Sequence, residues 1–105
     1  MKELSETDFN DAVASGTVLI DFNAEWCAPC KAMQPMLQRV SSEYGERLGI
    51  YSVDIDKQPA LAARHGVMSV PTFLIFKDGK QVERMVGALS EKDLKKKFGP
   101  YVGQQ

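Results

Sequence analysis

The sequence has little cysteine and no excess of charge of either sign. Cysteine occurs twice, whereas small secreted domains that depend on disulfides carry several cysteines spread along the chain. Thirteen basic and fourteen acidic residues give a net charge of -1, which provides no positive field to attract nucleic acid. No apolar run approaches the roughly 20 residues of a membrane span, and the polar start lacks the apolar segment of a secretory signal. We therefore expect a cytoplasmic protein with neither nucleic acid nor membrane as a partner.

Length and patterning predict one α/β domain over residues 1–105. The chain is 44% hydrophobic, and a domain of this size buries roughly two-thirds of its unfolded surface. Helical periodicity and capping residues predict helices at 5–16, 28–45, 59–66 and 90–98. Apolar runs predict strands at 17–22 and 50–56, a hairpin over 71–87 and a short edge strand near 2–4. This order predicts βαβ units in a central mixed β-sheet flanked by helices, ending in a hairpin plus helix.

Both cysteines lie in one short segment, DFNAEWCAPCKAMQP, which covers residues 21–35. Cys27 and Cys30 are separated only by Ala28 and Pro29. A structural zinc site needs four ligands, and beyond the pair the chain offers a single histidine, His65,. A disulfide placed for stability would close a longer loop, because a four-residue loop gives roughly 2 kcal/mol against about 4.7 for 100 residues. Redox exchange is the interpretation we favour, with no metal bound.

The position of the pair supports this chemistry. The predicted strand at 17–22 ends just before the cysteines, and Pro29 suits the first turn of the helix that follows. Cys27 would then lie at a helix N-terminus, where free N–H groups and the helix dipole lower a thiol pKa. Cys30 would lie in the first turn, facing the protein. His65, at a predicted helix C-terminus, is expected to interact with the dipole there.

Asp21 is the carboxyl group at the start of this segment. In the apolar run VLIDF it could be buried, which would raise its pKa and suit it to accept the Cys30 proton, through a water. It could equally lie exposed at the strand end or cap the helix. The residues alone leave both interpretations open.

Several motifs together resemble the thioredoxin family. They are WCAPCK preceded by DF, Pro35 inside the helix, VPT some forty residues later, the DGK hairpin and VGAL. The resemblance covers essentially the whole chain and implies the thioredoxin fold and a protein disulfide reductase. Cys27 would be the nucleophile, Cys30 the resolving thiol and Asp21 a buried acid. The protein would be a monomer without a cofactor of its own, acting on disulfide-containing client proteins. Its electrons would come from a flavin reductase fed by NADPH or, less commonly, from a ferredoxin-linked reductase.

The resemblance also implies a surface where client proteins dock. The Val70–Pro71 bond would be cis and packed against the cysteines, with the Val70 backbone pairing to an extended client segment. Ala28 and Pro29 would tune the redox potential. The small apolar docking surface would comprise Trp26, Ala28, Pro29, Val70, Pro71, Gly87 and Ala88.

Three positions depart from the family's usual pattern. Ala28 replaces the glycine most common between the cysteines, and Asn23 stands where tryptophan is frequent. Ser52 stands where many members have a lysine near the buried acid. Without that lysine, Asp21 lacks a partner that would favour its ionised form.

Two other functions use the same features. A disulfide oxidase or isomerase shares the chemistry, but usually has another dipeptide between the cysteines and acts outside the cytoplasm. A non-catalytic interaction module could share the fold, for example as a subunit that clamps a larger enzyme. Replacing both cysteines with serine separates the last case, because a pure binding module would keep its activity.

Overall fold

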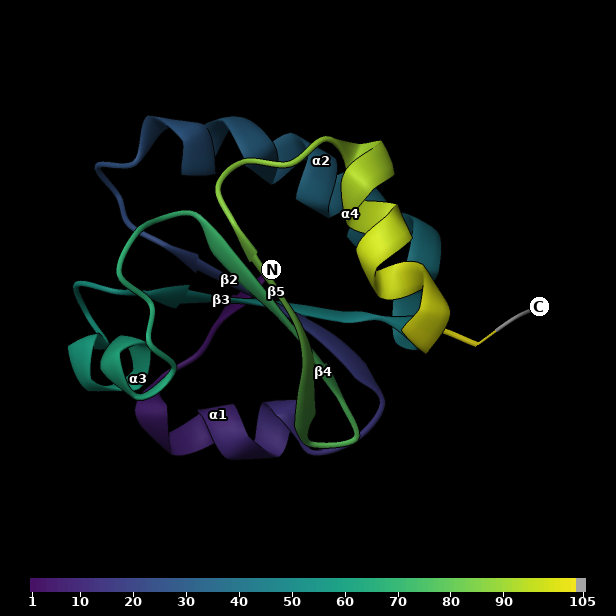
Figure 1. The fold of residues 1–105 in the computed structure, drawn as a ribbon, viewed down its shortest axis with the longest axis horizontal. Coiled ribbons are helices and arrows are strands. Elements are labelled where there is room, and N and C mark those ends of the chain that lie inside the picture. Colours follow the sequence, from purple (N-terminus) through teal and green to yellow (C-terminus); the bar gives the residue numbers. More distant parts are fainter. Residues whose placement is uncertain (104–105) are drawn as a thin grey trace.

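The computed structural model describes residues 1–103 as a central sheet between two pairs of helices. Helices α2 (Ala28–Tyr44) and α4 (Glu91–Phe98) cover one face, and α1 (Glu6–Val13) and α3 (Pro59–Arg64) cover the other (Figure 1). The strands are β1 (Lys2–Glu3), β2 (Thr17–Asn23), β3 (Gly49–Asp54), β4 (Thr72–Lys77) and β5 (Lys80–Val86). Short 3-10 turns follow α2 and α4, at Gly45–Arg47 and Gly99–Tyr101. The predicted fold class and element order are confirmed, including the short edge strand.

The sheet is mixed, with strand order β1-β3-β2-β4-β5 in the described part of the chain. Strands β1, β3 and β2 run parallel, and β4 runs antiparallel to both β2 and β5. Asp78 and Gly79 turn the predicted hairpin with φ of 51° and 87°, the positive values that a two-residue type I′ turn requires. A shift in register at Ile75 and Phe76 was not predicted, because a bulge leaves the apolar pattern of the strand intact.

Alternation along β2 assigns its side chains to two cores. Successive side chains of a strand point to opposite faces, and Leu19 belongs to the cluster with α2 and α4 whereas Ile20 belongs to the cluster with α1 and α3. Asp21 shares the Leu19 face. An acidic residue in a run of apolar ones is therefore directed at α2, beneath the cysteines.

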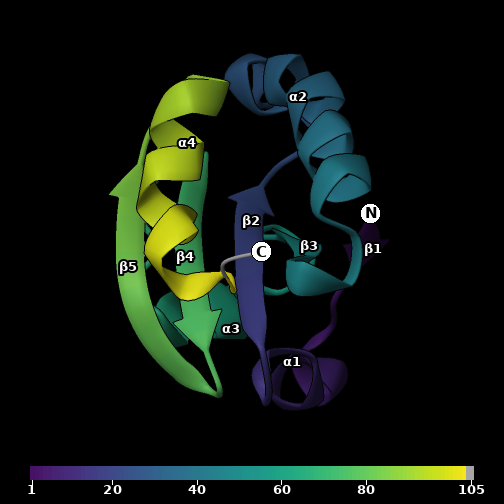
Figure 2. The same ribbon diagram turned by 90° about the vertical axis from the view of Figure 1, so that its right-hand side faces the viewer.

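The elements that carry the predicted site residues meet at one end of the sheet. The end of β2 pairs with the start of β4 at Phe22 and Thr72, and Thr72 pairs with Val86 at the end of β5. The amino end of α2 follows β2 directly at this same end (Figure 2). Residues far apart in the sequence are thereby brought next to the cysteine pair.

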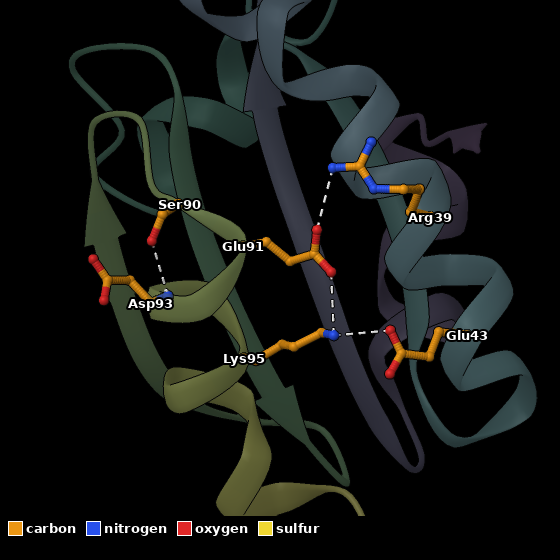
Figure 3. A network of polar contacts seen from close by, with 6 residues as sticks. All are labelled: Arg39, Glu43, Ser90, Glu91, Asp93 and Lys95. Carbon is orange, nitrogen blue, oxygen red and sulfur yellow. Dashed lines mark hydrogen bonds and ion pairs between the residues drawn. The ribbon is translucent and has the colours of Figure 1, made fainter.

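Ion pairs connect α2 to α4 on the surface, as Figure 3 shows. Arg39 pairs with Glu91 at 3.2 Å, and Lys95 pairs with Glu43 at 2.8 Å and with Glu91 at 3.1 Å. Lys95, from the KKK run, is therefore used within the protein, where exposed pairs of this kind contribute little individually.

The start of α4 depends on one side-chain cap. The hydroxyl of Ser90 accepts a hydrogen bond from the N–H of Asp93 at 3.1 Å (Figure 3). We expect Ser90→Ala to lower the free energy of unfolding by about 1 kcal/mol and the melting temperature by about 4 °C. Thermal denaturation checks this, with Ser42→Ala on the exposed face of α2 as the matched control. Equal melting temperatures for the two variants would contradict it.

Candidate active site

Cys27 and Cys30 form a disulfide at the amino end of α2, with their Cα atoms 5.3 Å apart. Cys27 is the N-cap residue of the helix, and its sulfur accepts a hydrogen bond from the Cys30 N–H at 3.2 Å. Pro29 lies in the first turn, where its missing N–H costs no helical hydrogen bond. The predicted helix start is confirmed, and an N–H group of that first turn points at Cys27.

Surroundings, rather than exposure, distinguish the two cysteines. Each has only 3% of its surface exposed. Cys27 stands between Trp26, Ala28 and Pro29, which are all exposed. Cys30 instead lines a cleft of about 230 Å³. Cys30 thus borders this cleft, and Cys27 is not among its lining residues.

Asp21 lies buried beneath the pair, which excludes the exposed or capping position left open by the sequence. The residue is 1% exposed. Burial raises the pKa of its carboxyl group from 3.8 to about 6, although hydrogen bonds from Asn23 and Gln34 act in the opposite direction and lower it. Asn23 Nδ2 lies 3.3 Å and Gln34 Nε2 3.4 Å from Asp21 Oδ2. The other oxygen, Oδ1, is buried without a hydrogen-bond partner among residues 1–103. The carboxyl group therefore takes up a proton close to neutral pH.

The cleft beside Cys30 is lined by residues of β1, β2, α2 and β3, most of which have polar or charged side chains. Asn23 and Gln34, the two partners of Asp21, form part of its wall, together with Ser52 of β3. Its remaining residues are Glu3, Ala24, Glu25, Lys31 and Asp54. The cleft gives solvent a route to Cys30 and to the two amide side chains that contact Asp21.

The loop before β4 lies against the disulfide. Val70 packs on the cluster that Cys27 and Cys30 form with Ala24, and the Val70–Pro71 bond is cis, as the resemblance implied. The Gly87 N–H donates to the Pro71 carbonyl at 2.8 Å. Val70 itself forms no backbone hydrogen bond within the described residues. Its peptide groups are thus free to pair with an added strand.

Trp26 is a surface residue and not a core aromatic. It is 68% exposed, and its indole N–H donates to Asp56 Oδ2 at 2.8 Å. Met68, in the loop before β4, is 95% exposed. The sequence did not single out Met68, because an isolated methionine carries no signal of its orientation.

His65 lies at the C-terminus of α3, as predicted, but its ring is a packing group. The centroid of the ring lies 4.9 Å from that of Phe9 and, in an edge-to-face arrangement, 6.0 Å from that of Phe76. Burial is the largest cause that lowers the pKa of His65, and the charges of Arg64 and Arg84 lower it further. The ring is therefore neutral at neutral pH and brings no positive charge to the helix dipole. Within residues 1–103 no three His, Cys, Asp or Glu side chains are grouped so that they could hold a metal ion.

Comparison with known proteins agrees with this geometry. The thioredoxin family model matches residues 1–99. The chain belongs to the thioredoxin family. It is 50% identical to a thioredoxin of Chlamydia caviae over 93 residues, which is 89% of each chain. It is 39% identical to a thioredoxin of Staphylococcus aureus over 92 residues, or 88% of each chain. A mutant thioredoxin from Halobacterium salinarum has the same fold, with a TM-score of 0.90 and 32% identity over 99% of this chain and 92% of that one.

Membership of the thioredoxin family settles the class of reaction. Thioredoxins are protein-disulfide oxidoreductases, and this chain has the required cysteine pair joined as a disulfide. It is therefore an enzyme of dithiol–disulfide exchange that acts on disulfide substrates and is served by a reductase partner, as in the rest of the thioredoxin family. No helix in the described part of the chain is long and apolar enough to cross a membrane.

One polar residue of the site, Gln34, was not predicted from the sequence. It lies four residues after Cys30 on α2, and residues at this spacing are neighbours on a helix face. Asn23 was noted only as a departure from the family pattern, yet it stands two residues after Asp21 on the same face of β2. Both spacings could be read from the sequence, but only the packing of α2 on β2 brings the Asn23 and Gln34 side chains together at Asp21.

Proposed function

We propose that the chain is a general protein disulfide reductase with Cys27 as nucleophile and Cys30 as resolving thiol. The observation that carries the proposal is the N-cap position of Cys27, whose sulfur receives the Cys30 N–H. Once the disulfide is reduced, that N–H and the positive end of the helix dipole stabilise a thiolate on Cys27. Cys30, which lines the cleft, is the thiol that resolves the mixed disulfide.

The reaction then runs in two exchanges. The Cys27 thiolate attacks a sulfur of the client disulfide, forms a mixed disulfide and expels the first client thiolate. Cys30 gives up its proton, and its thiolate attacks the Cys27 sulfur. The mixed disulfide breaks, the second client thiolate leaves, and the Cys27–Cys30 bond forms. The client gains two electrons, and the cysteine pair loses them.

Asp21 is the proposed acceptor of the Cys30 proton, through a water in the cleft. Its burial supports this role, because a pKa of about 6 makes the carboxylate a stronger base than an exposed aspartate while leaving it mostly ionised at neutral pH. The same group would return the proton when the pair is reduced again.

Trp26, Val70, Pro71 and Gly87, with the neighbouring Ala88, are the proposed contacts for an extended client segment. The free peptide groups of Val70 support pairing to that segment as to an added strand. The exposed Trp26 would cover the client on the other side of Cys27. Ala28 and Pro29, exposed between the sulfurs, are the proposed residues that tune the redox potential.

The chain's own cysteine pair is the only redox centre that this proposal requires. We propose that residues 1–105 work as one domain and as a monomer in the cytoplasm, with no bound cofactor. The reductase that restores the dithiol would be an NADPH-dependent flavoenzyme, with a ferredoxin-linked reductase as the alternative. A net charge of -1 gives nucleic acid no part in this function.

Trapping the intermediate tests the order of attack. In Cys30→Ser the second exchange cannot occur, so we expect a stable mixed disulfide between Cys27 and a client such as insulin, visible on a non-reducing gel. Reductant should release it. Cys27→Ser is the matched control and should trap only background amounts. Equal trapping by the two variants would contradict the assignment.

A further inference from the structure

Two amide side chains hold the buried carboxyl group from one side. We propose that Asn23 and Gln34 are positioning residues for the exchange reaction: they fix Oδ2 of Asp21 and leave Oδ1 as the atom that receives the Cys30 proton. This inference rests on the proposed role of Asp21 as proton acceptor. It gives a function to two residues that lack any chemistry of their own.

The contacts define which oxygen is free. Asn23 Nδ2 and Gln34 Nε2 both donate to Oδ2, at 3.3 and 3.4 Å. Oδ1 is buried and has no hydrogen-bond partner among residues 1–103. A buried polar atom without a partner is costly, and a catalytic role is one reason why a native structure retains one. Accepting a proton is such a task.

Local geometry explains why these two residues meet at Asp21. Asn23 follows Asp21 by two positions on β2, so both side chains lie on the same face of the sheet. Gln34 follows Cys30 by one helical turn on α2, which places its amide beside the resolving thiol. Both residues are half-buried and line the cleft with Cys30. Gln34 therefore connects the helix that carries the thiol to the strand that carries the acid, and Asn23 supports the same oxygen from within that strand.

The arrangement lets the proton transfer occur without rearrangement. A carboxylate that accepts both N–H groups on Oδ2 can be protonated on Oδ1 and keep both bonds. Cys30 S–H loses its proton to a water in the cleft, a proton passes from that water to Oδ1, and the Cys30 thiolate attacks the Cys27 sulfur as described above. Had the amides been divided between the two oxygens, protonation would weaken the hydrogen bond to the oxygen that takes the proton.

The amides also act where the family usually has a charge. Ser52, the neighbour of Asp21 in the parallel ladder, is neutral. The charged groups around the cleft are Glu3, Glu25, Lys31 and Asp54. The causes of the shift in the pKa of Asp21 are nevertheless other groups: burial raises the pKa, and hydrogen bonds from Asn23 and Gln34 lower it. Neutral donors thus keep the carboxyl group ionisable near neutral pH without the lysine.

A titration of the Asp21 carboxyl group tests this directly. In oxidised protein labelled with ¹³C at the aspartate carboxyl carbons, NMR follows the pKa of Asp21 in Asn23→Ala and in Gln34→Met. Loss of either donor should raise that pKa by about half a unit to one unit. The pH at half-maximal insulin reduction should move upward by a similar amount. The matched controls are Asn10→Ala and Gln38→Met, both at exposed helical positions, and they should match wild type.

The outcomes separate this inference from the proposed function. An unchanged pKa of Asp21 in both variants, or an unchanged pH profile of insulin reduction, would overturn the positioning role. Asp21→Asn tests the acceptor independently: if it keeps the wild-type pH profile, the proposed role of Asp21 fails. If Asp21→Asn alters the profile while Asn23→Ala and Gln34→Met do not, only the amide pair is refuted.

Discussion

Cys27→Ser is expected to abolish catalysis of disulfide reduction. A serine hydroxyl at the N-cap position keeps the helix cap, but it supplies no thiolate and can form no mixed disulfide. Insulin reduction by dithiothreitol should therefore proceed at the rate of dithiothreitol alone. Turbidity of the precipitating insulin B chain measures this rate.

The paired variant makes the result diagnostic. Cys30→Ser should also lose turnover, but it should retain one round of attack and accumulate the mixed disulfide. Ser41→Ala, at an exposed position further along α2, is the control for handling and should keep full activity. A Cys27→Ser protein that still accelerates insulin reduction would refute Cys27 as nucleophile. Retained function of both cysteine variants would indicate a binding module instead.

Asp21→Asn is expected to stabilise the oxidised protein at neutral pH. Burial raises the pKa of Asp21 from 3.8 to about 6, so ionisation of this group above pH 6 opposes folding. A shift of this size corresponds to about 3 kcal/mol. The neutral amide avoids that penalty and can still accept hydrogen bonds from Asn23 and Gln34. We expect a melting temperature roughly 10 °C higher at pH 7.

The pH dependence has a definite sign. Between the two pKa values the folded state binds more protons than the unfolded state, so Asp21 favours folding fully below about pH 4,. That contribution is lost as the pH rises through about 6. The stability difference between variant and wild type should thus be near zero at pH 3.5 and reach its maximum above pH 7. His65 titrates in both proteins, and its effect cancels in the difference.

Urea denaturation from pH 3.5 to 8 measures this difference. Asp11→Asn, which removes the same charge from the exposed face of α1, should show no comparable gain. A difference that stays constant with pH would show that Asp21 is not the titrating group. The gain in stability should accompany slower insulin reduction, because the variant has no carboxylate to accept the Cys30 proton.

Much of the fold could be predicted from local sequence patterns, and the structure has the elements that these patterns predicted. The β2 strand lies where its continuous apolar run predicted a strand, and the turn at Asp78 and Gly79 uses positive φ at both residues. Such signals depend on residues close in sequence, and they therefore survive without knowledge of the tertiary structure. The bulge in the hairpin had no such signal.

The site was predicted less completely, because its residues come from several different elements. Cys27 and Cys30 were identified from their spacing, and the cis bond before Pro71 only from the resemblance. Gln34 was missed, since a glutamine on a helix is usually exposed to solvent. The orientation of Met68 and the packing of His65 on aromatic rings also depend on neighbours distant in sequence.

The sequence by itself determined the reacting atoms of this protein. Two cysteines separated by two residues, at a strand-to-helix junction, place a sulfur at the helix N-terminus wherever that helix packs. Only the tertiary structure decided the state of Asp21, because its burial and its two amide partners arise when α2 packs across the end of β2. A thiolate can be stabilised by its own helix, whereas a carboxyl group is made basic only by what surrounds it.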